Sequence, residues 1–209
     1  GGRPWGQTPL ARGGQPAHQV LLAGQQFSQG RPGRIGFNAA LDFAQLALQL
    51  YTVRDAMAKD LDGTLAAVAA AGYHLVETAG MYGKSAADLR AQLEDNNLVV
   101  AEIEVVKGWC SPPGEASELC RELEDLAYEM ADEFGCRYLQ AVGPYEGTLA
   151  DAAPAFAALC DRAAAHGLLV GVEFLPFTNI RTAAEAKDLL DATDRPNAGC
   201  CVDIWHHTR

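Results

Sequence analysis

Two carboxylates and a histidine stand at the ends of apolar segments late in the chain. Glu173 closes the run VGVE, and Asp203 begins the segment DIWH that ends at His206. An acidic side chain at the end of an apolar strand is costly to bury unless it is paired or bound to a cation. Carboxylate oxygens with an imidazole nearby suit one divalent metal ion, namely Mn, Mg, Co or Zn. Pairing of Glu173 with a buried Arg or Lys is the alternative interpretation.

The segments that carry these residues alternate between strand-like and helix-like patterns. Leu119, Leu123, Leu126 and Met130 recur at helical spacing and form one apolar stripe within 115–134. Near-continuous apolar runs, which are typical of buried parallel strands, occur at 46–51, 73–77, 98–105, 137–142, 168–175 and 199–204. This alternation predicts the α/β class, built from successive strand–helix units.

The expected helix ends are marked by residues that tolerate a left-handed backbone. They are Gly72, Asn97, Gly135, Gly167 and Asn197. Each stands where a helical pattern stops and an apolar run begins. The spacing between them is that of repeated strand–helix units.

Polar side chains at the expected strand ends favour one architecture. They are Tyr51, Glu77, Glu104, Gln140, Glu173 and Asp203. In a TIM-type barrel the carboxyl ends of all strands meet on one face, where barrel enzymes place their reactive groups. An open doubly wound sheet concentrates its site at one switch point instead. The pattern therefore favours a TIM-type (β/α) barrel.

Composition separates a first segment from the rest and excludes some partners. Residues 1–36 are rich in Gly, Pro, Gln and Arg without periodicity, so we expect a disordered tail before a barrel domain over 46–209. The net charge of -11 disfavours nucleic acid, and no apolar run is long enough to span a membrane. The six cysteines include no C-x-x-C pair. Reduced thiols and a cytoplasmic location are the expectation.

Four segments resemble one known family. LALQLYTVRD at 46–55 and GYHLVET at 72–78 are similar to the opening of the xylose isomerase-like TIM barrel family. GVEFLPFTNIRT at 171–182 and PNAGCCVDIWHH at 196–207 resemble its metal-binding core. That family includes sugar phosphate isomerases and epimerases, inosose isomerases and dehydratases, ketose 3-epimerases and dehydroshikimate dehydratases.

The resemblance implies roles for individual residues. Glu173 matches a Glu that binds the metal ion and transfers a proton, and Asp203 matches a metal-binding Asp. His206 matches a His that contacts the substrate oxygen near the metal, with His207 as the alternative. Glu77 matches a strand-end acid that serves either as a substrate contact or as a structural hydrogen-bonding group.

The implied function is that of a divalent-metal-dependent sugar (phosphate) isomerase or epimerase acting through an enediolate. Family members have eight strands, whereas this sequence ends soon after the sixth, so the resemblance implies an incomplete barrel of about six strands and a fragment of the full enzyme. The implied partner is a small sugar or cyclitol, and a homo-oligomer is possible. The alternatives are a lyase on the same scaffold, such as an inosose or dehydroshikimate dehydratase, and a non-catalytic barrel remnant or a relative of apurinic-site endonucleases.

Overall fold

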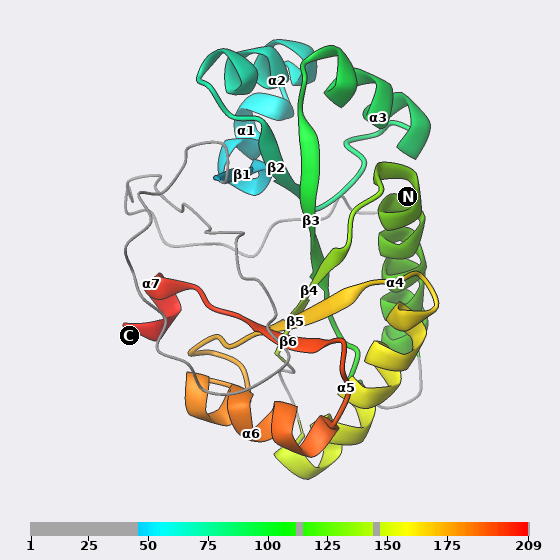
Figure 1. The fold of residues 1–209 in the computed structure, drawn as a ribbon, viewed down its shortest axis with the longest axis vertical. Coiled ribbons are helices and arrows are strands. Elements are labelled where there is room, and N and C mark those ends of the chain that lie inside the picture. Colours follow the sequence, from blue (N-terminus) through cyan, green and yellow to red (C-terminus); the bar gives the residue numbers. More distant parts are fainter. Residues whose placement is uncertain (1–45, 112–114, 144–146, 209) are drawn as a thin grey trace.

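The computed structural model describes residues 46–111, 115–143 and 147–208 (Figure 1). The tail predicted at 1–36 lies outside these residues. None of the helices in the described ranges has the length and apolar character that a bilayer crossing requires. All six cysteines are free thiols.

Six parallel strands form one sheet. They are β1 Ala47–Gln49, β2 Leu75–Thr78, β3 Val99–Val106, β4 Tyr138–Val142, β5 Leu169–Glu173 and β6 Ala198–Cys201. Each strand pairs with the next one in the sequence, so the order is β1-β2-β3-β4-β5-β6. A doubly wound sheet would reverse its order at a switch point. The monotonic order confirms the α/β barrel class, with six strands described.

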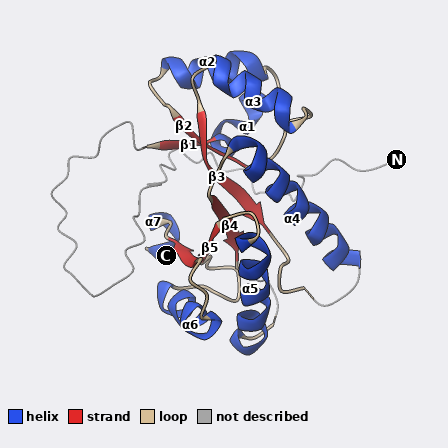
Figure 2. Cartoon of the chain, turned by 45° about the vertical axis from the view of Figure 1, so that its right-hand side comes forward, coloured by secondary structure: helices blue, strands red, loops and turns tan. Residues whose placement is uncertain are grey.

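Helices follow the strands in turn. They are the 3-10 helix η2 Leu50–Val53, then α1 Arg54–Met57, α2 Leu61–Ala70, α3 Ala86–Asp95, α4 Glu115–Phe134, α5 Leu149–Ala164, α6 Ala183–Thr193 and α7 Ile204–His207. Figures 1 and 2 show α2 to α6 arranged around the outer side of the curved sheet. Thr148 and Thr182 begin α5 and α6 with capping boxes, which satisfy backbone N–H groups at each helix start.

The core lies between the sheet and the outer helices. Val170 and Val172 of β5 are fully buried, and they share a face because successive strand side chains point to opposite sides. From the helices, Leu89, Phe156 and Leu189 are equally buried in this core. The outward-facing side of β5 is therefore apolar, whereas Glu173, one position after Val172, lies on the inner side.

Two expectations about element ends are wrong. Tyr51 was expected to close the first strand, but β1 ends at Gln49 and Tyr51 lies in η2, 51% exposed, with the Arg54 guanidinium over its ring. The strand ends early because the hydroxyl of Thr52 donates to the Gln49 carbonyl and turns the backbone. Gln49, at 5% exposed, is the polar residue that β1 contributes to the interior.

The other error concerns the end of α6. Gly72, Asn97, Gly135 and Gly167 have positive φ, as predicted, but the residue that ends α6 in the left-handed region is Asp194, with φ 50°, and not Asn197. Pro196 explains the earlier stop, because the residue before a proline disfavours the helical conformation. The side-chain amide of Asn197 instead donates to the carbonyls of Cys160 and Leu168, at 2.8 and 3.1 Å, which ties β6 to α5 and β5.

Candidate metal centre

Glu173, Asp203 and His206 converge on one point. Each offers a donor atom, and these atoms all lie within 4.8 Å of one another. Nε2 of His206 is 3.6 Å from Oδ2 of Asp203 and 3.9 Å from Oε1 of Glu173. Metal–ligand bonds of about 2.0–2.2 Å place two donors on one ion no more than about 4.4 Å apart, so both spacings fit a shared cation. Within the described ranges this is the only such group of three.

The ends of two neighbouring strands create this arrangement. Glu173 is the last residue of β5 and pairs in register with Cys201 at the end of β6. Two residues later comes Asp203, whose carbonyl accepts a hydrogen bond from the backbone N–H of His207 at 2.9 Å and so begins a helical turn. Residues three apart on a turn lie on the same side, which brings His206 to the carboxylate of Asp203.

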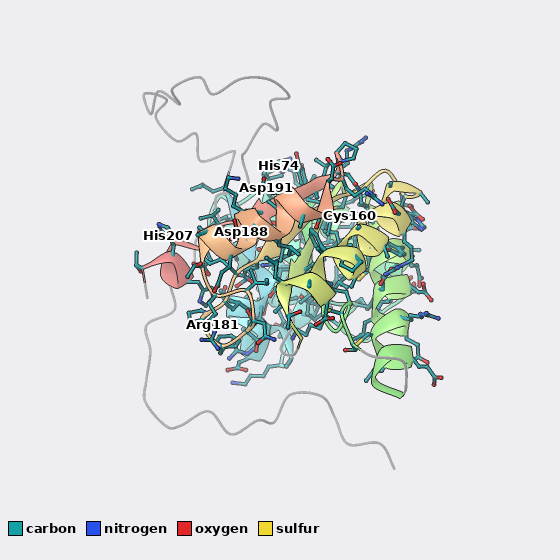
Figure 3. All side chains as sticks on the ribbon, turned by 90° about the horizontal axis from the view of Figure 1, so that it is seen from below. His74, Cys160, Arg181, Asp188, Asp191 and His207 are labelled. Atoms are coloured by element: carbon teal, nitrogen blue, oxygen red, sulfur yellow. The ribbon has the colours of Figure 1, made fainter. Side chains whose placement is uncertain are left out.

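His207 points elsewhere. Its ring packs edge-on against Phe174, with centroids 6.1 Å apart, and the residue is exposed on α7 (Figure 3). The structure thus brings His206, and not the alternative His207, to the two carboxylates.

The electrostatics of Glu173 suit a cation. No Arg or Lys of the described chain forms an ion pair with it, so the alternative of a buried basic partner gains no support. Its Oε2 instead accepts a hydrogen bond of 2.8 Å from Nε2 of Gln140 on β4. Burial, with Asp203, Glu104 and Glu102 nearby, raises the pKa of Glu173 to about 8. A bound divalent ion would offset this cost by favouring the charged carboxylate.

A second acidic group lines the inner face on β2 and β3. Burial and the neighbouring Glu102 and Glu104 raise the pKa of Glu77 to about 9, and burial with Glu104 raises that of Glu102 to about 7. Glu77 accepts a hydrogen bond of 3.3 Å from Nε2 of Gln49, while its Oε2 is buried and has no partner among the residues that the structure describes. Glu77 therefore lies inside the barrel but does not join the Glu173 group.

Three residues near these groups were not singled out from the sequence. Gln49 is the one polar residue in LALQL, and Glu102 stands two positions before Glu104 in an apolar run. Each pattern could have revealed an inward-facing side chain. For Phe177 no sequence pattern indicated a place near the site. It is 65% exposed in the β5–α6 loop, and its ring lies edge-on to that of His206, with centroids 6.3 Å apart.

Trp109 packs in the core and supports the loop after β3. It is buried, donates from Nε1 to the carbonyl of Val142 at 2.7 Å, and packs against Phe156 with ring centroids 5.1 Å apart. These contacts fix the loop after β3 against β4 and α5.

Comparison with known proteins identifies the family of the chain. A family model described as xylose isomerase-like TIM barrel matches residues 65–209. The chain belongs to this family. A search of curated proteins found no match.

Solved structures of related barrels also match this xylose isomerase-like chain. A D-allulose 3-epimerase from Methylomonas sp., in complex with D-allulose, is 25% identical with a TM-score of 0.56, over 68% of this chain and 56% of that one. An AP endonuclease of family 2 from Brucella melitensis is 24% identical with a TM-score of 0.58, over 70% and 64%. The IolI protein with a bound zinc atom is 16% identical with a TM-score of 0.62, over 74% and 60%. The chain therefore spans less than two thirds of the length of each.

Proposed function

We propose that this chain carries part of the active site of a divalent-metal-dependent isomerase or epimerase acting on sugars or cyclitols. The observation that supports this most is the convergence of Glu173, Asp203 and His206, with donor atoms within 4.8 Å of one another at the ends of β5 and β6. Barrel enzymes place their reactive groups at this end of the strands. The membership in the xylose isomerase-like family and the likeness to a ketose 3-epimerase agree with the proposal.

Each of the three residues has its own role in this proposal. Glu173 and Asp203 hold the ion, and His206 contacts the substrate oxygen beside it. When bound, the ion supplies Lewis acidity, which polarises a substrate carbonyl and acidifies the neighbouring C–H group. Glu173 takes up that proton.

The second acidic group suits a ligand rich in hydroxyl groups. Oε2 of Glu77 and Oε2 of Glu104 are buried oxygens without hydrogen-bond partners among the described residues. A polyhydroxylated substrate brings hydroxyl groups that can pair with them, and leaving such oxygens buried and unsatisfied costs about 1–3 kcal/mol each. Glu77 is thus assigned to substrate binding.

The decisive experiment measures conversion of ketoses and of inososes by the purified chain with Mn²⁺ and after treatment with a chelator. We expect Mn²⁺ binding to the chain, lost in Glu173→Gln and Asp203→Asn, and Mn²⁺-dependent isomerisation or epimerisation when the remaining part of the active site is present. Asp188→Asn is the matched control, because Asp188 is an exposed acid on α6 (Figure 3). Accumulation of a dehydrated product would assign the chain to the lyases instead. Absence of Mn²⁺ binding together with absence of turnover would reject the proposal.

A further inference from the structure

Gln140 lies in the middle of β4 with 1% of its surface exposed. On the neighbouring strand its register partner is Gly171, which pairs in turn with Gly199 of β6. Gly171 has no side chain and shares a strand face with Glu173, two positions later. The Gln140 side chain can therefore extend across β5, and its Nε2 reaches Sγ of Cys201 on β6 at 3.7 Å.

The same Nε2 donates to Oε2 of Glu173 at 2.8 Å. In the opposite orientation of the Gln140 amide, its oxygen would face a carboxylate oxygen, and both are acceptors. The contact with Glu173 therefore determines that Nε2, and not Oε1, of Gln140 faces the carboxylate. The other carboxylate oxygen of Glu173, Oε1, lies 3.9 Å from Nε2 of His206. The two oxygens of Glu173 thus face different partners.

We propose that Gln140 is a positioning residue that occupies Oε2 of Glu173, so that Glu173 offers the cation Oε1 alone. This inference rests on the proposed function, because it concerns how that metal centre is assembled. A carboxylate can bind a cation through one oxygen or through both. Holding Glu173 to one oxygen leaves an additional coordination position for a substrate oxygen. Hydrogen-bonding groups behind a metal ligand commonly act in this way, by fixing its orientation.

A similar amide–carboxylate pair provides an internal control. Gln49 on β1 is 5% exposed and donates to Glu77 on β2 at 3.3 Å. Both glutamines are buried strand residues whose Oε1 has no hydrogen-bond partner within the described part of the chain. The two pairs differ in that Glu77 is not one of the three converging donors. Replacing Gln49 therefore removes a comparable buried amide without touching the metal centre.

The test compares Gln140→Met with Gln49→Met in the full chain, using Mn²⁺ titration calorimetry and the visible absorption spectrum of bound Co²⁺. Methionine fills a similar volume and donates no hydrogen bond. We expect Gln140→Met to weaken Mn²⁺ binding by about 10-fold or more, the usual effect of losing such a supporting hydrogen bond. The Co²⁺ spectrum should also change, because Glu173 becomes free to bind through both oxygens. Gln49→Met should keep both properties of the parent chain.

Other results overturn the inference. Parent-like Mn²⁺ affinity or a parent-like Co²⁺ spectrum in Gln140→Met would show that Glu173 does not depend on Gln140. Equal losses in both variants would show a general effect of removing a buried amide. If Gln140→Met does not fold, Gln140→Asn, whose amide is one methylene too short, must show the same two changes. Mn²⁺ binding that Glu173→Gln abolishes but Gln140→Met leaves intact would reject this inference while the proposed metal centre stands, whereas a parent chain that binds no Mn²⁺ would reject both.

Discussion

Nε2 of His206 lies 3.6 Å from Oδ2 of Asp203, three residues earlier in the chain. The same nitrogen is 3.9 Å from Oε1 of Glu173, so His206 stands at the edge of the carboxylate pair. Its ring also meets the exposed ring of Phe177 edge-on. In the proposed metal centre the two carboxylates supply the negative charge for a hard divalent ion, and His206 is assigned to the substrate oxygen beside it.

Replacement of His206 should therefore separate metal binding from turnover. We expect His206→Gln to keep Mn²⁺ affinity within about 3-fold and to lower kcat by about 100-fold, the scale of losing a catalytic proton or hydrogen-bond partner. Calorimetry and steady-state kinetics on the same preparations provide the comparison. A loss of Mn²⁺ affinity as large as that of Asp203→Asn would make His206 a metal ligand.

Glu77 should make stability depend on pH. Its pKa is raised to about 9 in the folded chain, against 4.5 for an unperturbed Glu, by burial and by the neighbouring Glu102 and Glu104. Between these values the unfolded chain releases the proton while the folded chain keeps it, so the free energy of unfolding falls as pH rises. The contribution is fully lost above the folded pKa. The Glu77→Gln variant has no ionisable group at this position, so its free energy of unfolding should not fall with pH for this reason.

Urea unfolding of the parent chain and of Glu77→Gln at pH 5 to 9 measures this effect. The stability of the variant relative to the parent should increase across that range by at least about 1.4 kcal/mol, the free energy of one unit of pKa difference. Glu102 and Glu104 titrate in both proteins, so the comparison largely removes their contribution. Parallel pH profiles would mean that Glu77 is not neutral in the folded chain.

The strand order and the convergence of Glu173, Asp203 and His206 followed from the sequence. The apolar runs predicted six strands in the right order because buried parallel strands are rich in apolar residues. The stripe of Leu119, Leu123, Leu126 and Met130 within 115–134 predicted α4 with its observed bounds. The strand end at Glu173 and the three-residue step from Asp203 to His206 were visible because both are local features. These local features were sufficient to predict that Glu173, Asp203 and His206 lie close together.

The contacts between strands could not be predicted in this way. A register shift between Val76 and Glu77 sets Glu77 opposite Glu102 of β3, and no pattern within either strand reveals it. The hydrogen bond from Gln140 to Glu173 likewise depends on Gly171, the residue of β5 opposite Gln140, because its missing side chain leaves room for the amide. Tyr51 was misplaced because a single side-chain hydrogen bond, from Thr52 to Gln49, ends β1 early.

Arg162 should stabilise the fold through a buried carboxylate. Glu124 of α4 is 4% exposed and receives two hydrogen bonds from Arg162 of α5, at 2.5 and 2.9 Å, as well as one from the Tyr128 hydroxyl at 2.6 Å. Arg162→Met leaves this carboxylate underpaired, and we expect the free energy of unfolding to fall by about 2 kcal/mol in urea titrations.

An exposed pair of the same chemistry provides the control. Arg195 also donates two hydrogen bonds to one carboxylate, that of Asp161, at 2.6 and 3.0 Å, but both side chains face solvent. Surface pairs contribute little because water already solvates them. Arg195→Met should thus be clearly less destabilising than Arg162→Met. Equal effects would show that burial of Glu124 does not govern the contribution of its partner.

Gly143 should be intolerant of a side chain because it meets the loop that follows Glu173. It comes directly after β4, and its N–H donates to the Glu173 carbonyl at 3.2 Å. A Cβ at this position would lie 2.9 Å from Oγ1 of Thr178 and 3.3 Å from Cβ of Ile180. Thr178 is buried, and its hydroxyl contacts the backbone oxygens of Leu175 and Ile180, so it cannot move without breaking the turn.

We expect Gly143→Ala to lower the free energy of unfolding by about 1–3 kcal/mol, the usual cost of overpacking. Gly80, which also follows a strand, has no atom of the described residues within 4 Å of such a Cβ, so Gly80→Ala is the matched control and should be nearly neutral. Thr178→Ala removes the hydroxyl that the new methyl group would meet. In that background Gly143→Ala should therefore cost less, and a double-mutant cycle measures the difference. Strict additivity of the two substitutions would show that the contact with Thr178 is not what excludes a side chain at Gly143.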